Sequence, residues 1–407
     1  MNRSETMDST NKLWSKNFIL VVVANLFVYQ GFQMLIPTLP VYVKSMGGSE
    51  LQAGLVVSLF AFSALVFRSI TGKGADTIGR KPFLLIGFLV LILFNVSFFA
   101  FSIVAMLPLL RLFQGAGWGM TSTAIATIMA DNVPDARRGE GTGYYALSVI
   151  LATSIAPIIG ISVLNHYDFN MILVLTTVFM VIGFILTQGI SIPKQEKQPE
   201  PANAQKESFW KSLFEKKALL PSLLCLFLAV PFGGLMSFIA LFGEEIGIEN
   251  IWIYFVGHCF MILISRPFIG KLFDSKGPAI VIFPGAILML IGLLLLSFTT
   301  TIPMLILTSV FYGLSFGAVQ PSLQAWAIDR SASNRKGAAN GTFLSFMDLG
   351  VALGSLVLSS VAAATSYAMM YRISSICMVI FIIIYGIYLL KTRSQKHSED
   401  HAEAANH

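Results

Sequence analysis

Residues 68–82 read Arg-Ser-Ile-Thr-Gly-Lys-Gly-Ala-Asp-Thr-Ile-Gly-Arg-Lys-Pro and lie between two long apolar runs. We expect this charged segment to form a tight turn that joins two hydrophobic helices. A second copy, Arg-Pro-Phe-Ile-Gly-Lys-Leu-Phe-Asp-Ser-Lys-Gly-Pro, occupies residues 266–278. Four residues of the first copy recur 198 positions later (266 − 68 = 198), and the matching pairs are Arg68 and Arg266, Gly72 and Gly270, Asp76 and Asp274, Gly79 and Gly277. A charged turn repeated at one offset predicts two similar halves.

The composition is typical of a protein surrounded by lipid. The chain has 407 residues, of which 55% are hydrophobic and 12% are charged, and its mean hydropathy is +0.75. Soluble globular proteins carry about 25% charged residues, so the polar residues here are too few to cover a soluble body of this size. The three cysteines all lie in apolar runs, and they provide neither a disulfide framework nor a zinc site.

The apolar runs predict the number of membrane spans, because a spanning helix needs about 20 mostly apolar residues. The longest polar segment follows the sixth run, so we expect an all-α membrane protein with 12 transmembrane helices in two pseudo-symmetric six-helix halves. The predicted parts are residues 1–190, a cytoplasmic linker at 191–217, residues 218–390 and a cytoplasmic tail at 391–407. The candidate spans are 17–38, 51–71, 82–104, 106–131, 141–163, 171–190, 218–243, 251–271, 278–299, 303–328, 338–362 and 369–390.

The placement of Lys and Arg predicts the orientation, since cytoplasmic loops of membrane proteins are enriched in both. With the N-terminus inside, only Lys44 and Arg372 of the 27 basic residues fall on the outer side. We therefore expect a multi-pass protein of the cell membrane with both termini in the cytoplasm. The basic residues then face anionic lipid headgroups, so the net charge of +6 does not indicate nucleic acid. We expect the protein to be a monomer.

The offset of 198 residues extends well beyond the charged turn. It relates Gly115 to Gly313, Gly119 to Gly317, Asp131 to Asp329, Arg137-Arg138-Gly139 to Arg335-Lys336-Gly337, and Gly143 to Gly341. Six spans return the chain to its starting side, so the two halves keep the same topology. Parallel repeats of this kind are one of the known transporter designs, with the binding site between the halves near mid-membrane.

Three motifs in the first half carry a family resemblance. Residues 72–81 resemble the G-x-L-A-D-x-x-G-R-K/R loop signature of the major facilitator superfamily, although Gly74 stands where that signature usually has Leu. Arg111-x-x-Gln114-Gly115 resembles its fourth-helix signature. Ala156-Pro157-x-x-Gly160 resembles the antiporter signature G-P-x-x-G with its first Gly replaced. Together the motifs resemble those of the 12-spanner drug:proton antiporters.

The resemblance implies that the charged turns latch one conformation of the transporter, with Asp76 engaging the start of the eleventh span and nearby basic residues. Such a latch must be breakable, so its contacts should amount to only a few kcal/mol. The alternative is a plain solvated turn, which the second copy disfavours. The expected gating residues are Gly72, Asp76, Gly79, Arg80, Arg266, Gly270 and Asp274.

Arg111 is predicted to lie one to two turns inside the fourth span. An Arg at the centre of a membrane helix costs about 2.5–3.5 kcal/mol, so we expect it to face the interior and to hold a partner. Gln114, three residues later on the same helix face, is the expected neighbour. The resemblance implies that Arg111 takes part in proton coupling. The alternative is that Arg111 snorkels to the outer interface.

Asp348 is the only carboxylate well inside a predicted span. It follows the expected start of the eleventh span, near Ala338, by ten residues, which places it about 15 Å deep at 1.5 Å per residue. An intramembrane acid indicates a functional site, and here it would exchange protons. The alternative is a structural acceptor for hydrogen bonds between helices. A single acid in the cavity suits a cationic or neutral substrate.

Further candidates for proton coupling or substrate binding lie in the first and eighth spans. Asn25, Tyr29 and Gln33 are spaced four residues apart and predict a polar helix stripe that faces a cavity. His258 could titrate near neutral pH, or it could be a packed core residue. For Asn25, Tyr29 and Gln33 the alternative is ordinary helix packing.

Several chemistries have no motif in this chain, which contains no Walker A loop, HExxH, GxSxG or Rossmann fingerprint. We therefore expect neither an enzyme nor a metal or other cofactor, and we expect a proton gradient as the energy source. The prediction is a secondary transporter that couples efflux of small organic compounds to protons by alternating access. The alternatives are a transporter for one metabolite, such as a sugar, metallophore or lipid-like compound, or a non-transporting membrane receptor or membrane-embedded enzyme.

Overall fold

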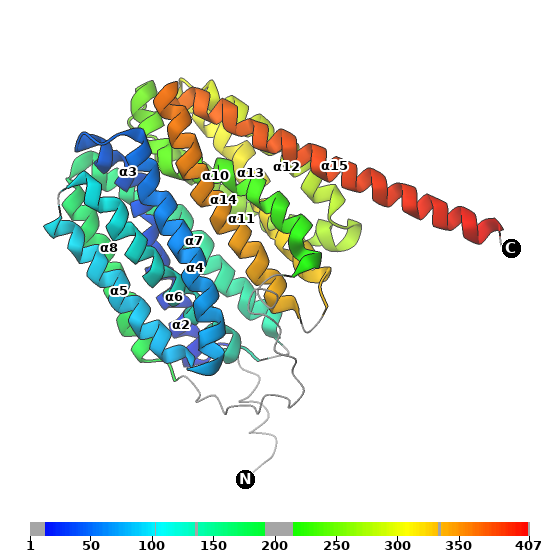
Figure 1. Ribbon diagram of the computed structural model, residues 1–407, viewed down its shortest axis with the longest axis horizontal. Coiled ribbons are helices and arrows are strands. Elements are labelled where there is room, and N and C mark those ends of the chain that lie inside the picture. The colour runs from blue at the N-terminus through cyan, green and yellow to red at the C-terminus, as the bar shows by residue number, and fades with distance from the viewer. Residues whose placement is uncertain (1–12, 102, 135–136, 192–214, 333–334, 406–407) are drawn as a thin grey trace, which may run out of the picture.

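A computed structural model describes residues 13–101, 103–134, 137–191, 215–332 and 335–405 (Figure 1). In these ranges every regular element is a helix. Most of the predicted linker, residues 192–214, lies outside the described residues.

The helices of the first half are α2 (Lys16–Gln33), α3 (Leu35–Ser45), α4 (Glu50–Thr77), α5 (Arg80–Ala100), α6 (Leu107–Asn132), α7 (Arg138–His166) and α8 (Phe169–Gln188). Those of the second half are α10 (Leu219–Ile246), α11 (Ile253–Lys276), α12 (Ala279–Ser297), α13 (Ile302–Asp329), α14 (Lys336–Ala364) and α15 (Tyr367–Ala405). Since α2 and α3 follow one another in a single span, each half has six long helical segments in the described ranges.

By length and apolar composition, ten described helices can cross a membrane, and α11 makes eleven when its bent halves are counted together. The bend of 44° separates Ile253–Arg266 from Phe268–Lys276. Pro267 lies at this point, and a proline lacks the N–H that an unbroken helix requires. The remaining helix, α6, has 26 residues and a largely buried surface that includes Arg111. Its polar and glycine residues lower its hydropathy, but its length and its packing against α4 and α5 fit the twelfth predicted span.

The helix contacts repeat from one half to the other. In the first half, α4 and α5 pack on α6, α2 packs on α7 and α8, and α5 packs on α8. The second half has the corresponding set: α11 and α12 on α13, α10 on α14 and α15, and α12 on α15. The predicted pseudo-symmetry is therefore confirmed.

The charged turns are much shorter than predicted. Helix α4 continues to Thr77 and α5 begins at Arg80, so only residues 78 and 79 connect them. At the equivalent site in the second half, Gly277 and residue 278 connect α11 and α12. Gly79 (φ 102°) and Gly277 (φ 80°) both have positive φ, a conformation that favours glycine.

Arg68, Gly72 and Asp76, and their repeats Arg266, Gly270 and Asp274, thus lie in helices rather than in a turn. The turn prediction was wrong at these positions because α4 and α11 continue in helical form through their polar ends.

Two other boundaries differ from the prediction. The first span extends to Ser45 instead of ending near residue 38, and it is interrupted at Met34. Two prolines follow, Pro37 and Pro40, and each removes a backbone donor from the helix. The predicted polar tail after residue 390 is helical, since α15 runs on to Ala405 and leaves the bundle (Figure 1).

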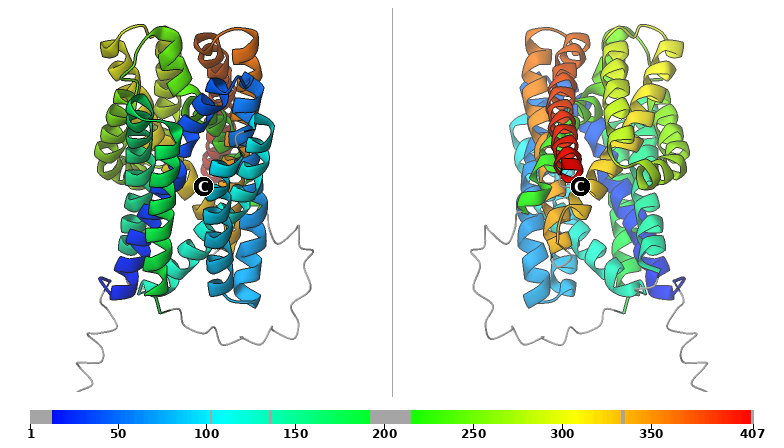
Figure 2. Two further views of the ribbon diagram at one scale, coloured as in Figure 1. Left: turned by 90° about the vertical axis from the view of Figure 1, so that its left-hand side faces the viewer. Right: turned by 90° about the vertical axis from the view of Figure 1, so that its right-hand side faces the viewer.

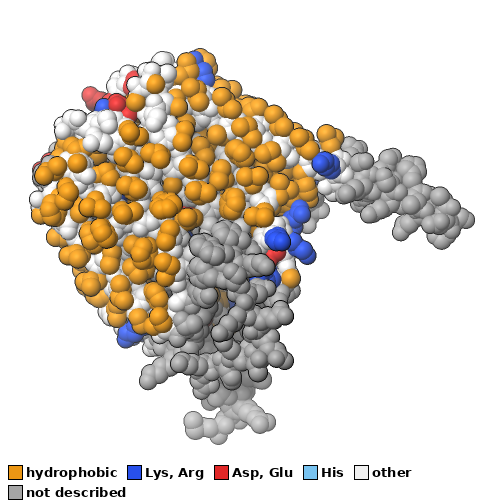
Figure 3. Space-filling view, viewed as in Figure 1, with side chains coloured by type: hydrophobic (Ala, Val, Ile, Leu, Met, Phe, Trp, Pro, Cys, Tyr) orange, Lys and Arg blue, Asp and Glu red, His pale blue; other side chains and the backbone are white. Residues whose placement is uncertain are grey.

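The surface that faces outward from the bundle is apolar. Hydrophobic side chains cover most of the described face in Figure 3, and Lys and Arg gather at its margins. Large exposed hydrophobic residues include Leu89, Leu93, Ile185, Phe260 and Ile383. A soluble protein rarely exposes so large a continuous apolar area, so this face fits contact with lipid.

The helices run roughly along one common direction, seen from two sides in Figure 2. We call the end of the bundle at which α8 stops and α10 starts the linker end, and the opposite end, with the α3–α4 connection, the distal end. At the distal end the halves are in close contact. Gly54 of α4 packs on Ser355 and Ser359 of α14, and the Asn165 side-chain amide donates to the Glu249 carbonyl oxygen at 3.0 Å. The distal end is therefore closed.

Candidate functional site

An ion pair joins the two halves inside the bundle. Arg68 of α4 donates from Nε to Asp348 Oδ2 of α14 at 3.1 Å. Arg68 lies 18 residues from the distal start of α4 and Asp348 lies 12 residues from the linker-end start of α14, so both are near mid-depth. Their side chains are 19% and 24% exposed, so solvent reaches them. Asp348 therefore has a cationic partner, which the sequence analysis did not identify.

Two tyrosines complete this central cluster. Tyr29 of α2 lies near both Arg68 and Asp348, and Tyr145 of α7 lies near Arg68 and Tyr29. The Tyr29 ring also packs edge-on against Trp118, with ring centroids 4.6 Å apart. Four helices from both halves thus contribute to one polar site. Of the predicted residues, Tyr29 and Asp348 are brought together.

Arg111 is fully buried and faces the interior, as predicted. Its Nε donates to the Val56 carbonyl oxygen at 3.0 Å, its Nη1 donates to Gln114 Oε1 at 2.7 Å, and its guanidinium lies 4.0 Å from the Phe60 ring centroid. The contact with Gln114 was expected, and snorkelling is wrong. Gln114 in turn donates to Asn95 Oδ1 at 3.0 Å.

Asn95, the one amide in the largely apolar helix α5, was not predicted as a site residue. Its Nδ2 donates to Thr176 Oγ1 at 3.0 Å and to Thr177 Oγ1 at 2.8 Å, so it links α5 and α8 to the Arg111 network. This network is separate from the central cluster. Val56 precedes Arg68 by 12 residues on α4, which is about 18 Å along the helix.

His258 is buried among aromatic rings. The centroids of Tyr254, Tyr312 and Phe316 lie 6.0, 5.7 and 6.1 Å from its ring. Under the offset of 198, His258 corresponds to Phe60, whose ring packs on Arg111 (258 − 198 = 60). The position is thus occupied by a packed ring in both halves, which favours the packing interpretation of His258.

The predicted polar stripe of the first span does not face one cavity. Asn25 is fully buried, and its Nδ2 donates to Ser148 Oγ of α7 at 2.9 Å. Gln33 is 6% exposed. Only Tyr29 of the three reaches the central cluster. For Asn25 the stripe prediction is wrong, because its amide forms a helix-to-helix contact within the first half.

At the linker end, the predicted gating residues have unequal surroundings. Arg80, the first residue of α5, pairs with Asp131 near the end of α6. Asp274 is exposed to solvent on the polar end of α11. The side chain of Asp76 lies outside the described part of the structure, so its latch contact stays a prediction.

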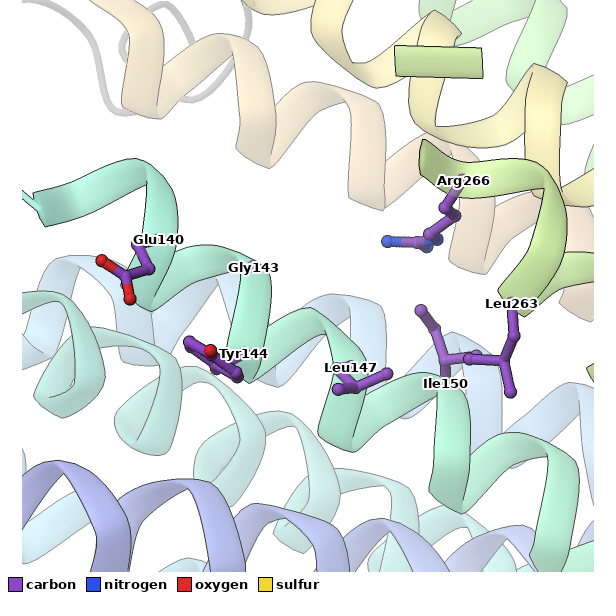
Figure 4. Close-up of a pocket in the computed structure, with 7 residues that line it drawn as sticks. All are labelled: Glu140, Gly143, Tyr144, Leu147, Ile150, Leu263 and Arg266. Carbon is purple, nitrogen blue, oxygen red and sulfur yellow. The ribbon is translucent and has the colours of Figure 1, made fainter. Parts of the chain in front are cut away.

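A cavity of about 400 Å³ lies between the halves, and its lining extends from Glu140 near the linker end of α7 to Ile150, 12 residues from the start of that helix. It is lined by α7 and α11 (Figure 4), through Glu140, Gly143, Tyr144, Leu147, Ile150, Leu263 and Arg266. Its size is within the range of small-molecule sites. In the described ranges, no three His, Cys, Asp or Glu side chains are grouped closely enough to hold a metal ion. The site therefore combines a closed distal end, a bridging ion pair and a cavity between the halves.

The model of the Major Facilitator Superfamily matches residues 21–355 and 250–407. The chain belongs to the Major Facilitator Superfamily. This family consists of transporters rather than enzymes, so the protein is a secondary transporter. The resemblance seen in its motifs is confirmed.

Relatives of this superfamily member align along almost the whole chain. Multidrug resistance protein MdtG of Escherichia fergusonii is 25% identical over 97% of this chain and 99% of its own. The multi-drug resistance efflux pump PmrA of Streptococcus pneumoniae is 26% identical over 93% and 97%. The staphylopine export protein of Staphylococcus aureus is 21% identical over 90% and 94%.

Solved superfamily structures share the fold. A bacterial homologue of the human lysosomal transporter Spinster, described as inward-facing and unoccupied, has a TM-score of 0.75 at 14% identity and covers 92% of this chain and 96% of its own. A point mutant of the nucleoside transporter NupG has a TM-score of 0.74 at 14% identity and covers 91% and 99%.

Proposed function

We propose that this protein is a proton-coupled exporter of small organic compounds that works by alternating access. The observation that carries the proposal is the Arg68–Asp348 ion pair. It joins the halves between a closed distal end and a cavity that lies toward the linker end. A change in this pair can therefore alter how the halves contact each other.

Protonation of Asp348 would remove the negative charge that compensates Arg68. The free energy of the pair would then be lost, and a partly buried guanidinium would be left without its partner. This change weakens the contact between α4 and α14. Because the Asp348 side chain is partly accessible, we expect protons to reach it from solvent. Proton binding and movement of the halves would thus be linked thermodynamically.

The orientation follows from Lys and Arg placement. We propose that the linker end faces the cytoplasm, that both termini lie there, and that the protein acts as a monomer in the cell membrane. In this orientation the cavity between α7 and α11 would lie toward the cytoplasm, the side from which an exporter loads its substrate. MdtG and PmrA, whose names describe drug resistance and efflux, support the export direction.

The second candidate is export of one specific metabolite. It is favoured by the similarity to the staphylopine export protein, which extends over 90% of this chain. The two candidates share the transport mechanism and differ in the range of compounds accepted.

Accumulation of fluorescent organic compounds in cells with and without the protein tests the proposal. We expect lower accumulation in cells that express the protein, and we expect an uncoupler that collapses the proton gradient to abolish the difference. Arg68→Gln should behave like the cells without protein. Export that persists after the gradient collapses would contradict proton coupling. Equal accumulation for every compound, with one secreted metabolite instead, would support the second candidate.

A further inference from the structure

The two halves of the repeat differ in the residue that lies opposite Arg266. It is the repeat of Arg68 (68 + 198 = 266), and the repeat of Asp348 is Ile150 (348 − 198 = 150). Both Arg266 and Ile150 line the cavity between α11 and α7 (Figure 4). The second half therefore keeps the arginine of the bridging pair, but the first half offers an isoleucine where an acid would be needed.

The surroundings of Arg266 leave its charge uncompensated. Its Nε is buried and has no hydrogen-bond partner among the described residues. The acid that lines the same cavity, Glu140, instead pairs with Arg137 at 2.8 Å. Arg266 is half-buried, and a partly desolvated cation without a counter-ion favours binding of an anion. Guanidinium groups bind carboxylates well because two parallel N–H donors match the two oxygens.

The rest of the cavity is suited to an apolar body. Leu147, Ile150 and Leu263 provide aliphatic surface, and Tyr144 adds an aromatic ring. Ligand sites commonly combine such a lining with one or two polar anchors. Asp348, which by itself would suit a cation, is neutralised by Arg68. The accessible site therefore carries a net positive charge, which favours an anionic substrate. The sequence had predicted a cationic or neutral substrate.

We infer that this cavity binds organic anions, with the carboxylate or a similar acidic group on Arg266 and the apolar body against α7 and Leu263. The inference rests on the proposed function, since it names the substrate class of the transport site. Two sources could supply such an anion: a soluble compound or the headgroup of an anionic lipid.

Isothermal titration calorimetry on the full chain in phosphatidylcholine nanodiscs tests this inference with two matched probes, 2-naphthoate and 2-naphthalenemethanol. They share one ring system and differ in charge. We expect wild-type protein to bind 2-naphthoate at least about tenfold more tightly than the alcohol, because a hydrogen bond to a charged group contributes about one to two orders of magnitude in affinity. Arg266→Gln should abolish this preference.

Ile150→Asp provides a second test that keeps the arginine. The new carboxylate would recreate the bridging pair of the other interface, so it should also abolish the preference for 2-naphthoate. Lys276→Gln is the matched control, because it removes one exposed positive charge from the end of α11 outside the cavity, and it should leave the preference intact. Equal affinity for both probes in wild-type protein, or a preference that survives in folded Arg266→Gln, would overturn the inference.

Nanodiscs that contain phosphatidylglycerol separate the two sources of the anion. Weaker binding of 2-naphthoate in these discs would show that the headgroup shares the site, and unchanged binding would assign it to soluble anions. Either outcome supports an anion-binding site at Arg266 and identifies the source of the anion. The titration needs no proton gradient, so its failure would leave proton-coupled export untouched, and a failure of coupling would leave the binding result valid.

Discussion

Gly54 lies at a close contact between the two halves at the distal end. A Cβ atom placed on Gly54 would lie 2.5 Å from the Ser355 carbonyl oxygen and would also meet the Ser359 side chain. A carbon–oxygen contact needs about 3.3 Å, so Gly54→Ala forces α4 and α14 apart by about 0.8 Å. Overpacking of this kind costs about 1–3 kcal/mol.

This cost applies only while the distal end is closed. Gly54→Ala therefore changes the ratio of closed to open distal ends by about 5- to 150-fold in favour of the open form. Gly115→Ala is the matched control, because its added Cβ would meet the Phe60 backbone of α4 within the same half. It should lower stability without changing the contact between the halves.

Double electron–electron resonance between labels at Ser45→Cys and Asn250→Cys, both exposed at the distal end, measures this ratio. The native Cys225, Cys259 and Cys377 must first be replaced. We expect Gly54→Ala to add a population at longer distance that the parent lacks. An unchanged distance distribution, or the same shift in Gly115→Ala, would refute the idea that the contact at Gly54 closes the distal end.

Three other predictions concern single residues. Arg111→Lys should lower the stability of the detergent-solubilised protein by about 1.5–3 kcal/mol. One ammonium cannot reproduce the hydrogen bonds to both Val56 and Gln114. An unchanged melting temperature would argue against a stabilising Arg111 network. The Arg335 side chain donates to Glu215 at 2.8 Å and lowers the pKa of Glu215. This contact therefore stabilises the folded state above the ordinary Glu pKa, and the stabilisation is lost as the pH falls through the lowered pKa. Melting curves should therefore lose stability below about pH 4.3 in wild-type protein and less in Glu215→Gln, and identical curves would exclude the contribution. His258→Phe should keep gradient-driven transport, since its position is that of a packed ring; complete loss of transport would instead place His258 in the coupling path.

The fold could be predicted from the sequence because its main determinants are local and repeated. Apolar runs of spanning length identify the helices, and the offset of 198 residues relates the two halves. The turns were harder to predict. Hydropathy decreases where a helix leaves the lipid, although the helix itself continues, as α4 does from Gly72 to Thr77.

The site could be predicted only in part. Asp348 and Arg111 were identifiable because a charge within an apolar run is costly and needs a partner. Their partners could not be predicted, since Arg68 and Asp348 are 280 residues apart and meet only when the halves assemble. The repeat did not help, because the equivalent of Asp348 is Ile150. Asn95 was overlooked because one amide in an apolar span has no periodic pattern that distinguishes it.

Proton movement during substrate binding is the most direct test of the central claim, which is that Asp348 links protonation to the contact between the halves. Purified protein in proteoliposomes with a trapped pH-sensitive dye would receive a compound that the accumulation assay shows to be exported. We expect a substrate-dependent proton flux in wild-type protein and in Glu249→Gln, a control at an exposed distal acid, and none in Asp348→Asn that still binds the compound. A wild-type flux in Asp348→Asn would contradict the account.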